Sequence, residues 1–137
     1  MMWKTRRISK LMVVLVMAIA VSGAVIPQVM AQDLTEPSRV MDNYLASLVS
    51  GDTQQLVTLI DGRMKRKSAH LVLNPETYSQ FLKQHYTGVQ TTVESIVPEG
   101  DRMRARVRFD FPSADSSVIE FVLTQLDGQW KITDEAF

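Results

Sequence analysis

Residues 102–111 read RMRARVRFDF, and this stretch decides the fold that the sequence predicts. Apolar side chains occupy every second position, and charged side chains fill the positions between them. A period of two is typical of a β-strand that buries one face and exposes the other. The apolar face consists of Met103, Ala105, Val107, Phe109 and Phe111. The opposite face carries a row of four arginines, Arg102, Arg104, Arg106 and Arg108.

Three further strands are expected around this one. Residues 89–97 alternate with the same period, which places the odd-numbered side chains on one face, and the PEGD turn at 98–101 follows. Residues 118–126 are strongly apolar, and the DG pair at 127–128 is typical of a tight hairpin turn. A last strand then places Trp130, Ile132 and Asp134 on one face.

Helical periodicity precedes the strands. Apolar residues in 38–50 recur at helical spacing, and Gly51 is suited to end that helix. Asp52 can cap a second helix that extends to residue 60, and Asn74 with Pro75 begins a third that ends at Gly88. The basic run at 63–67 is expected to be solvated, and 68–73 fit a strand or a loop. This order predicts an α+β domain with three helices packed on one face of a four-stranded antiparallel sheet.

The first 31 residues have the pattern of a secretory signal peptide. A basic start precedes an apolar run at 11–26, and small residues lead to Ala31. We expect cleavage after Ala31, with a second candidate site after Ala24. The apolar run is shorter than the roughly 20 residues of a spanning helix, and a retained membrane anchor is the alternative. The prediction is a signal peptide at 1–31, a domain at 32–137, and export to the periplasm or beyond the cell.

Charge and composition exclude several classes of protein. The chain has 15 basic and 15 acidic residues, but residues 1–31 hold four basic groups and no acid. The domain at 32–137 therefore carries 11 basic and 15 acidic groups, and we expect no nucleic acid as its partner. The absence of cysteine excludes a disulfide framework and a thiolate metal site. Two histidines fifteen residues apart lack metal-ligand spacing, so we expect no metal and no cofactor.

Two stretches resemble the nuclear transport factor 2-like (NTF2-like) superfamily, which includes ketosteroid isomerase-like and SnoaL-like domains. MDNYLASLVSGD at 41–52 resembles the first helix of that superfamily and its junction with the second. DGQWKITD at 127–134 is similar to the terminal hairpin of many members. With the predicted signal peptide, the chain resembles an exported bacterial member of this superfamily. The resemblance implies a strongly curved sheet wrapped around helices, forming a cone with an apolar pocket. It implies function poorly, because this fold hosts isomerases, hydrolases, transport factors and binding domains.

The resemblance also singles out candidate catalytic residues. Tyr44 has the spacing before the Gly-Asp pair at 51–52 that the oxyanion-binding tyrosine has in the steroid isomerases. The aspartate that serves there as the base is missing, since 63–71 contain no acid and only His70 as a candidate base. His85 lies on the apolar stripe of the third helix and is the other candidate. The alternative for Tyr44 is a core position on the apolar face of its helix.

Candidate binding residues fall into two groups. A pocket for a small apolar or lipid-like ligand is expected to use the aromatic residues and their neighbours, although core packing explains the same residues. These are Tyr44, Tyr78, Phe81, His85, Phe109 and Trp130. The arginine row either binds an anionic group or forms an interface, or else pairs across the sheet with carboxylates such as Glu94 or Glu120. By resemblance, we expect a homodimer through the outer face of the sheet.

These observations predict an exported domain that binds an apolar or amphipathic ligand, or a partner protein, without catalysing a reaction. One alternative is an isomerase or hydrolase that uses Tyr44 with His85 or His70. Another is a membrane-anchored accessory subunit of an envelope complex, or a protein similar to the periplasmic phospholipid-shuttle proteins. Contact with a membrane is expected only if the N-terminal segment is retained.

Overall fold

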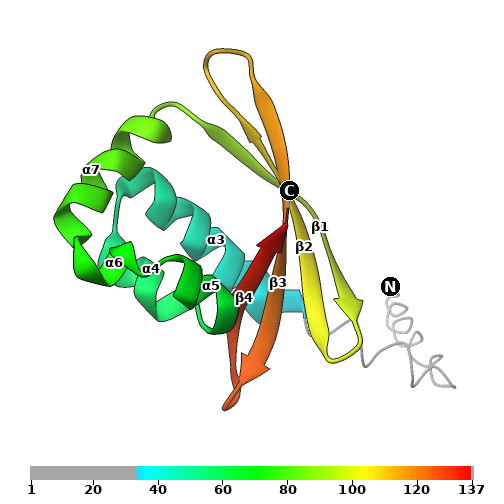
Figure 1. Cartoon of the computed structure of the whole chain (residues 1–137). Helices are drawn as coiled ribbons and strands as arrows, with labels where there is room; N and C mark the ends of the chain where they lie inside the picture. Colours follow the sequence, from blue (N-terminus) through cyan, green and yellow to red (C-terminus); the bar gives the residue numbers. More distant parts are fainter. Residues whose placement is uncertain (1–33, 137) are drawn as a thin grey trace, which may run out of the picture. The chain divides into compact units, whose positions relative to one another are not determined.

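The computed structural model describes residues 34–136 (Figure 1). The signal peptide predicted at 1–31 and its cleavage after Ala31 lie outside the described residues. Within the described part, no helix has both the length and the apolar character needed to cross a membrane.

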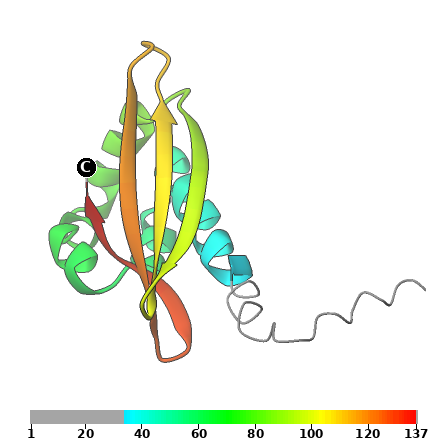
Figure 2. The same ribbon diagram turned by 90° about the vertical axis from the view of Figure 1, so that its right-hand side faces the viewer.

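Five helices precede four strands in the described part of the chain. The helices are α3 (Thr35–Ser50), α4 (Thr53–Leu59), α5 (Gly62–Lys67), α6 (His70–Leu73) and α7 (Pro75–His85). The strands are β1 (Gln90–Glu99), β2 (Arg102–Asp110), β3 (Ser116–Leu126) and β4 (Gln129–Ala136). The strands form one antiparallel sheet in the order β1-β2-β3-β4. The sheet curves around the helices, all of which cover one of its faces (Figures 1 and 2), so the predicted α+β class is confirmed.

The two short helices α5 and α6 occupy the basic run at 63–67 and the stretch 68–73 that follows it. The prediction that 68–73 form a strand or a loop is wrong, because 70–73 are helical. The Asp61 carboxylate accepts a hydrogen bond from the Gly62 N–H at 2.7 Å and so caps α5. Each short helix buries a single apolar side chain, Met64 in α5 and Leu71 in α6. One buried residue per helix leaves no apolar periodicity, and for that reason the pattern did not predict them.

Gly51 follows the end of α3 and packs against α7. Its φ of +72° is in the left-handed region, and a Cβ built there would lie 2.8 Å from the Ser79 carbonyl oxygen. The Ser79 hydroxyl donates a hydrogen bond to the Gly51 carbonyl at 2.7 Å. A glycine at this position therefore both ends α3 and allows α7 to approach closely, which sets where the side chains of α7 lie.

The core lies between the helices and the inner face of the sheet. Met103, Ala105, Val107 and Phe109 of β2 are buried there, as the alternating pattern predicts. They pack with apolar side chains of α3, α4 and the other strands. These include Met41, Leu45, Leu48, Leu56, Phe121, Leu123 and Ile132.

Two β-bulges change which residues face the helices. In β1 the register shifts between Val93 and Ser95, so Ile96 lies opposite Ala105 on the inner face. Val97 lies opposite Arg104 on the outer face and is 48% exposed. The prediction that all odd-numbered residues of 89–97 share one face is therefore wrong beyond the bulge. A bulge inserts one residue into one strand and reverses the alternation after it.

The second bulge lies in β4. The ladder with β3 pairs Ile132 with Leu123 but pairs Asp134 with Val122, so Thr133 is the inserted residue. Asp134 is consequently on the outer face, and the prediction that it shares a face with Ile132 is wrong. Glu135, opposite Phe121, is on the inner face instead.

Candidate functional site

Six rings follow one another from α6, along α7, to the residue that follows β2. We call them the aromatic row. Tyr78, Phe81 and His85 are spaced three and four residues apart on α7, so their side chains lie along one side of the helix. The Phe81 ring stacks between its neighbours, with centroids 5.7 Å from Tyr78 and 5.4 Å from His85. The complete row is His70, Tyr78, Phe81, His85, Tyr86 and Phe111.

The two ends of the row join α7 to other parts of the domain. At one end the His70 ring of α6 meets Tyr78 edge to face at 4.1 Å. At the other end His85 meets Phe111, which follows β2, at 5.6 Å. Tyr86 contacts both His85 and the buried Phe109, at 4.7 and 5.9 Å. The row therefore spans the domain from α6 to the end of β2.

The aromatic row is partly open to solvent. Phe81 is 51% exposed, and His70 and His85 are also exposed. At the His85 end the row borders a groove of about 590 Å³. The groove is lined by His85, Phe111, Pro112, Ser113, Asp115 and Ser117. This arrangement offers an apolar surface next to a hollow that contains hydroxyls, an imidazole and a carboxylate.

Tyr44 lies inside the domain, and its ring makes its aromatic contact with the core rather than with the row. It is 6% exposed, and its ring packs edge to face on Phe121 at 5.5 Å. Burial raises the pKa of the Tyr44 phenol well above its ordinary value, and Glu135 raises it further. Burial also raises the pKa of Tyr78, and the negative charge of Glu135 adds a smaller increase. The pKa of Tyr86 is raised to about 12, mainly by burial and to a smaller extent by the charges of Tyr78 and Glu135.

Glu135 is therefore the carboxylate that all three tyrosines of the chain share. Its side chain is 21% exposed, and its carboxylate lies 3.5 Å from the ammonium group of Lys67 in α5. Lys67 and Arg63 also approach Asp134, at 4.0 and 3.6 Å. The Asp61 N–H donates to the Ile132 carbonyl at 3.0 Å, so the segment before α5 pairs with the edge of β4. Sequence reasoning missed Glu135, because the bulge at Thr133 that turns it inward has no sequence signal.

The structure brings together only part of the predicted ligand-binding set. Tyr78, Phe81 and His85 lie in the aromatic row, and Phe109 is buried beneath Tyr86. Tyr44 packs in the core, and Trp130 is half-buried near the start of β4, where it pairs with Gln125. Sequence reasoning did not assign Tyr86 or Phe111 to the site. The position of Tyr86 one residue after His85 was the available signal.

The arginine row lies on the outer face of the sheet among carboxylates. Arg104 bonds Glu99 at 2.8 Å and Glu120 at 3.2 Å. Arg106 bonds Glu94 at 3.0 Å and Glu120 at 3.4 Å. Arg108 lies within 3.7 Å of Glu94 and Asp110, and Arg102 is exposed at the end of the row. The carboxylates offset most of the positive charge of this face.

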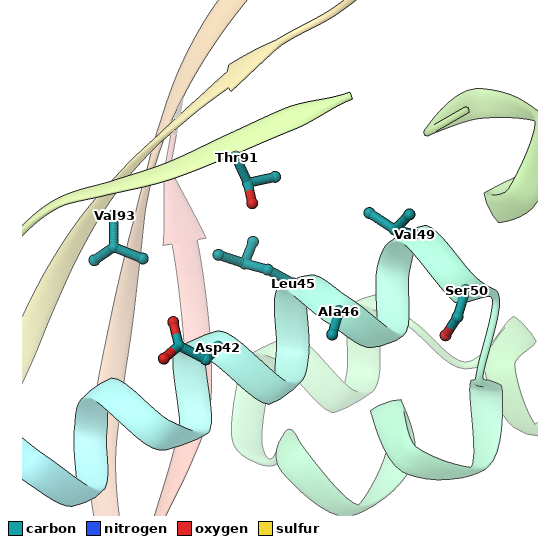
Figure 3. A pocket seen from close by; sticks show the side chains of 7 residues that line it. All are labelled: Asp42, Leu45, Ala46, Val49, Ser50, Thr91 and Val93. Carbon is teal, nitrogen blue, oxygen red and sulfur yellow. The ribbon is translucent and has the colours of Figure 1, made fainter. Parts of the chain in front are cut away.

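Two other hollows lie between described residues. The first, of about 520 Å³, separates α3 from the edge strand β1 (Figure 3). Leu45, Val49 and Val93 line it together with Asp42, Ala46, Ser50 and Thr91. The second, of about 370 Å³, is on the outer face and is lined by Arg106, Val118, Glu120 and Ala136. Among residues 34–136, no group of three or more His, Cys, Asp or Glu side chains is placed to hold a metal ion.

Comparison with known proteins addresses the fold. No family model matches the chain, and no curated protein matches its sequence. Solved structures do match. An NTF2-like protein of unknown function from Shewanella baltica is 13% identical with a TM-score of 0.56, over 77% of this chain and 91% of that one. A second, from Methylobacillus flagellatus, is 17% identical with a TM-score of 0.54, over 76% and 89%.

A third NTF2-like protein of unknown function, from Silicibacter pomeroyi, is 11% identical with a TM-score of 0.55, over 77% of this chain and 93% of that one. At these identities the likeness concerns the fold, and the three matches agree on it. They also agree with the curved antiparallel sheet and the helices that precede it. The described domain has the NTF2-like fold.

Proposed function

We propose that residues 32–137 form an exported, non-catalytic domain that binds an apolar or amphipathic ligand on the aromatic row. The observation that carries this proposal is the half-exposed Phe81 ring, stacked between Tyr78 and His85 in a row that leads to a groove. Apolar surface that adjoins a hollow with a few polar groups is the usual form of a small-molecule site.

The lining of the groove indicates the chemistry of the ligand. Phe111 and Pro112 supply apolar surface, whereas the Ser113 hydroxyl donates to the Asp115 carboxylate at 3.1 Å. A carboxylate at the polar end repels an anionic group, so the preferred ligand has an apolar body and an uncharged or cationic polar end. The apolar body then covers Phe81, and the polar end reaches Ser113 and Asp115.

The arrangement of the candidate catalytic residues supports a binding function. The ring contacts of His70 are with Tyr78, and those of His85 are with Phe81, Tyr86 and Phe111. Tyr44 packs instead on Phe121 in the core. An enzyme of the expected isomerase type needs the phenol and the base to face one bound substrate. Glu135 is the carboxylate that acts on the three tyrosines, and Lys67 pairs with it at 3.5 Å.

The proposal includes a homodimer through the outer face of the sheet. This face alternates arginines with Glu94, Glu99, Glu120 and Asp110, so two copies related by a twofold axis can place unlike charges opposite each other. Val118 and the hollow beside it provide apolar surface within the same face.

The proposed binding is tested with N-phenyl-1-naphthylamine, an uncharged apolar probe whose fluorescence rises in an apolar site. We expect saturable binding to the chain and at least a tenfold loss of affinity in Phe81→Ala, because the variant removes an aromatic side chain worth about 1.5–3 kcal/mol. Leu126→Ala is the matched control, since Leu126 is also exposed but lies at the β3–β4 turn. Equal affinities for the original chain and Phe81→Ala contradict the proposal.

A further inference from the structure

Positive charge is dense in two short segments of the domain, the arginine row at 102–108, where ion pairs with carboxylates hold Arg104, Arg106 and Arg108, and residues 62–75. Residues 62–75 contain four basic residues and no acidic one, whereas the remainder of 32–137 contains seven basic and 15 acidic residues. The segment forms α5 and α6, which follow each other directly in the chain. In this second segment basic residues therefore stand without any acidic residue between them, in a domain that is acidic overall.

Of the four basic residues, two pair with carboxylates of β4 and two are exposed without such a pair. Arg63 and Lys67, one turn apart on α5, pair with Asp134 and Glu135 and hold the helix on β4. Lys65 and Arg66 lie between them on α5 and are exposed. Within residues 34–136, no ion pair joins either of them to a carboxylate. Their charges are available to a partner.

Exposed apolar side chains follow these cations. Val72 and Leu73 of α6 are 63% and 73% exposed, more than the other large apolar residues that the structure describes at the surface. Leu71, between His70 and Val72, is buried and fixes α6 to the domain. Single exposed apolar residues are common on proteins, but an adjacent exposed pair that follows two unpaired cations within eight residues of the chain is a specific combination.

We propose that this α5–α6 surface, defined by Lys65, Arg66, Val72 and Leu73, docks on a membrane surface that contains anionic phospholipid. The cations contact the phosphate groups, and the two apolar side chains enter the boundary between headgroups and acyl chains. A purely acidic protein partner satisfies the cations and leaves Val72 and Leu73 in water. The membrane satisfies both, and it is the occupant to which the combination points.

This inference does not depend on the proposed ligand or on a retained N-terminal segment. It does have a consequence for that ligand, since the aromatic row begins at His70, between α5 and Val72. A domain docked through α6 has one end of the row next to the bilayer, from which an amphipathic molecule can pass to Phe81.

The absence of cysteine makes a site-specific test direct. Leu73→Cys and Leu126→Cys are each labelled with a nitrobenzoxadiazole fluorophore. Each labelled protein is mixed with vesicles of phosphatidylcholine alone, or with vesicles in which about one lipid in three is the anionic phosphatidylglycerol. A label at position 73 is expected to brighten and shift to the blue with anionic vesicles only. The label at position 126, an exposed leucine at the β3–β4 turn, is expected not to respond. This local readout holds whether or not residues 11–26 are retained.

The cations are tested in the same labelled protein. Lys65→Gln with Arg66→Gln is expected to weaken the response about 30-fold, since each basic residue near an anionic surface contributes about 1 kcal/mol. Gln54→Glu with Gln125→Glu changes the net charge by the same amount elsewhere and is expected to have little effect. Equal responses at positions 73 and 126, or no response to anionic vesicles, overturn the proposal. A response to polyglutamate but not to vesicles overturns it in favour of an acidic protein partner.

Discussion

Glu135 of β4 lies directly across the ladder from Phe121 of β3, so both side chains face the helices. The Tyr44 ring packs on Phe121, and the Lys67 ammonium lies 3.5 Å from the Glu135 carboxylate. Through this pair the last strand meets α3 and α5 at one place. The core residue Tyr44 and the basic helix α5 therefore contact neighbouring residues of the same strand pair.

The Lys67–Glu135 pair is expected to contribute modestly to stability. Its side chains are 39% and 21% exposed, which places the pair between a surface and a buried ion pair. We expect a coupling free energy of about 1 kcal/mol in a double-mutant cycle with Lys67→Ala and Glu135→Gln, measured by urea unfolding. Lys65→Ala, two residues before Lys67 at an exposed position, is expected to change the free energy of unfolding by less than about 0.5 kcal/mol. A coupling of zero means that the pair does not hold α5 on β4.

Tyr44 is expected to stabilise the fold through the packing of its ring rather than through its hydroxyl. Tyr44→Ala removes a buried aromatic side chain and should lower the free energy of unfolding by about 3–5 kcal/mol. Tyr44→Phe retains the edge-to-face contact with Phe121 and should change it by no more than about 1 kcal/mol. Chemical denaturation of both variants measures the difference. A large loss in Tyr44→Phe assigns the hydroxyl a role that ring packing does not explain.

Tyr86 makes the stability sensitive to alkaline pH. Its pKa is raised from about 10 in the unfolded chain to about 12 in the folded one, mainly by burial. A raised pKa gives stability that is complete below the unfolded value and is lost as the pH rises through the folded value. We expect the free energy of unfolding to fall less steeply between pH 10 and 12 in Tyr86→Phe than in the original chain. The same slope in both proteins argues against the buried position of the phenol.

The outer face is expected to support a dimer. Arg106→Glu places a third carboxylate beside Glu94 and Glu120 and reverses the charge at the centre of the face. We expect the original chain to sediment as a dimer and the variant as a monomer. Circular dichroism of the variant must first show that the fold is retained, because the same change removes two ion pairs within the sheet. If the original chain sediments as a monomer at a protein concentration of tens of micromolar, the proposed interface is contradicted.

The sequence predicts the overall fold well because its strongest patterns are long. The α3 stripe and the alternation in β2 extend over several turns or repeats, and the structure contains both where they were expected. Single-residue features escaped prediction for a physical reason. The bulges after Val93 and at Thr133 each insert one residue without a Gly or Pro to mark it, and each reverses the faces of all residues beyond it.

The site shows the same division between long patterns and tertiary contacts. The spacing of Tyr78, Phe81 and His85 on one helix was readable, and the structure places the three rings in contact. Phe111 joins them only because β2 ends beside α7, which no local pattern states. Trp130 is far from them along the sheet because the β3–β4 hairpin extends in the other direction. Local periodicity thus predicts one side of a site, and topology supplies the other.

The most direct measurement of the central claim is native mass spectrometry of the protein isolated from cells without detergent. The account predicts a noncovalent adduct with an apolar or amphipathic molecule, and its loss in Phe81→Ala but not in Leu126→Ala. The bare protein mass in the original chain, together with no adduct when N-phenyl-1-naphthylamine is added, contradicts the account.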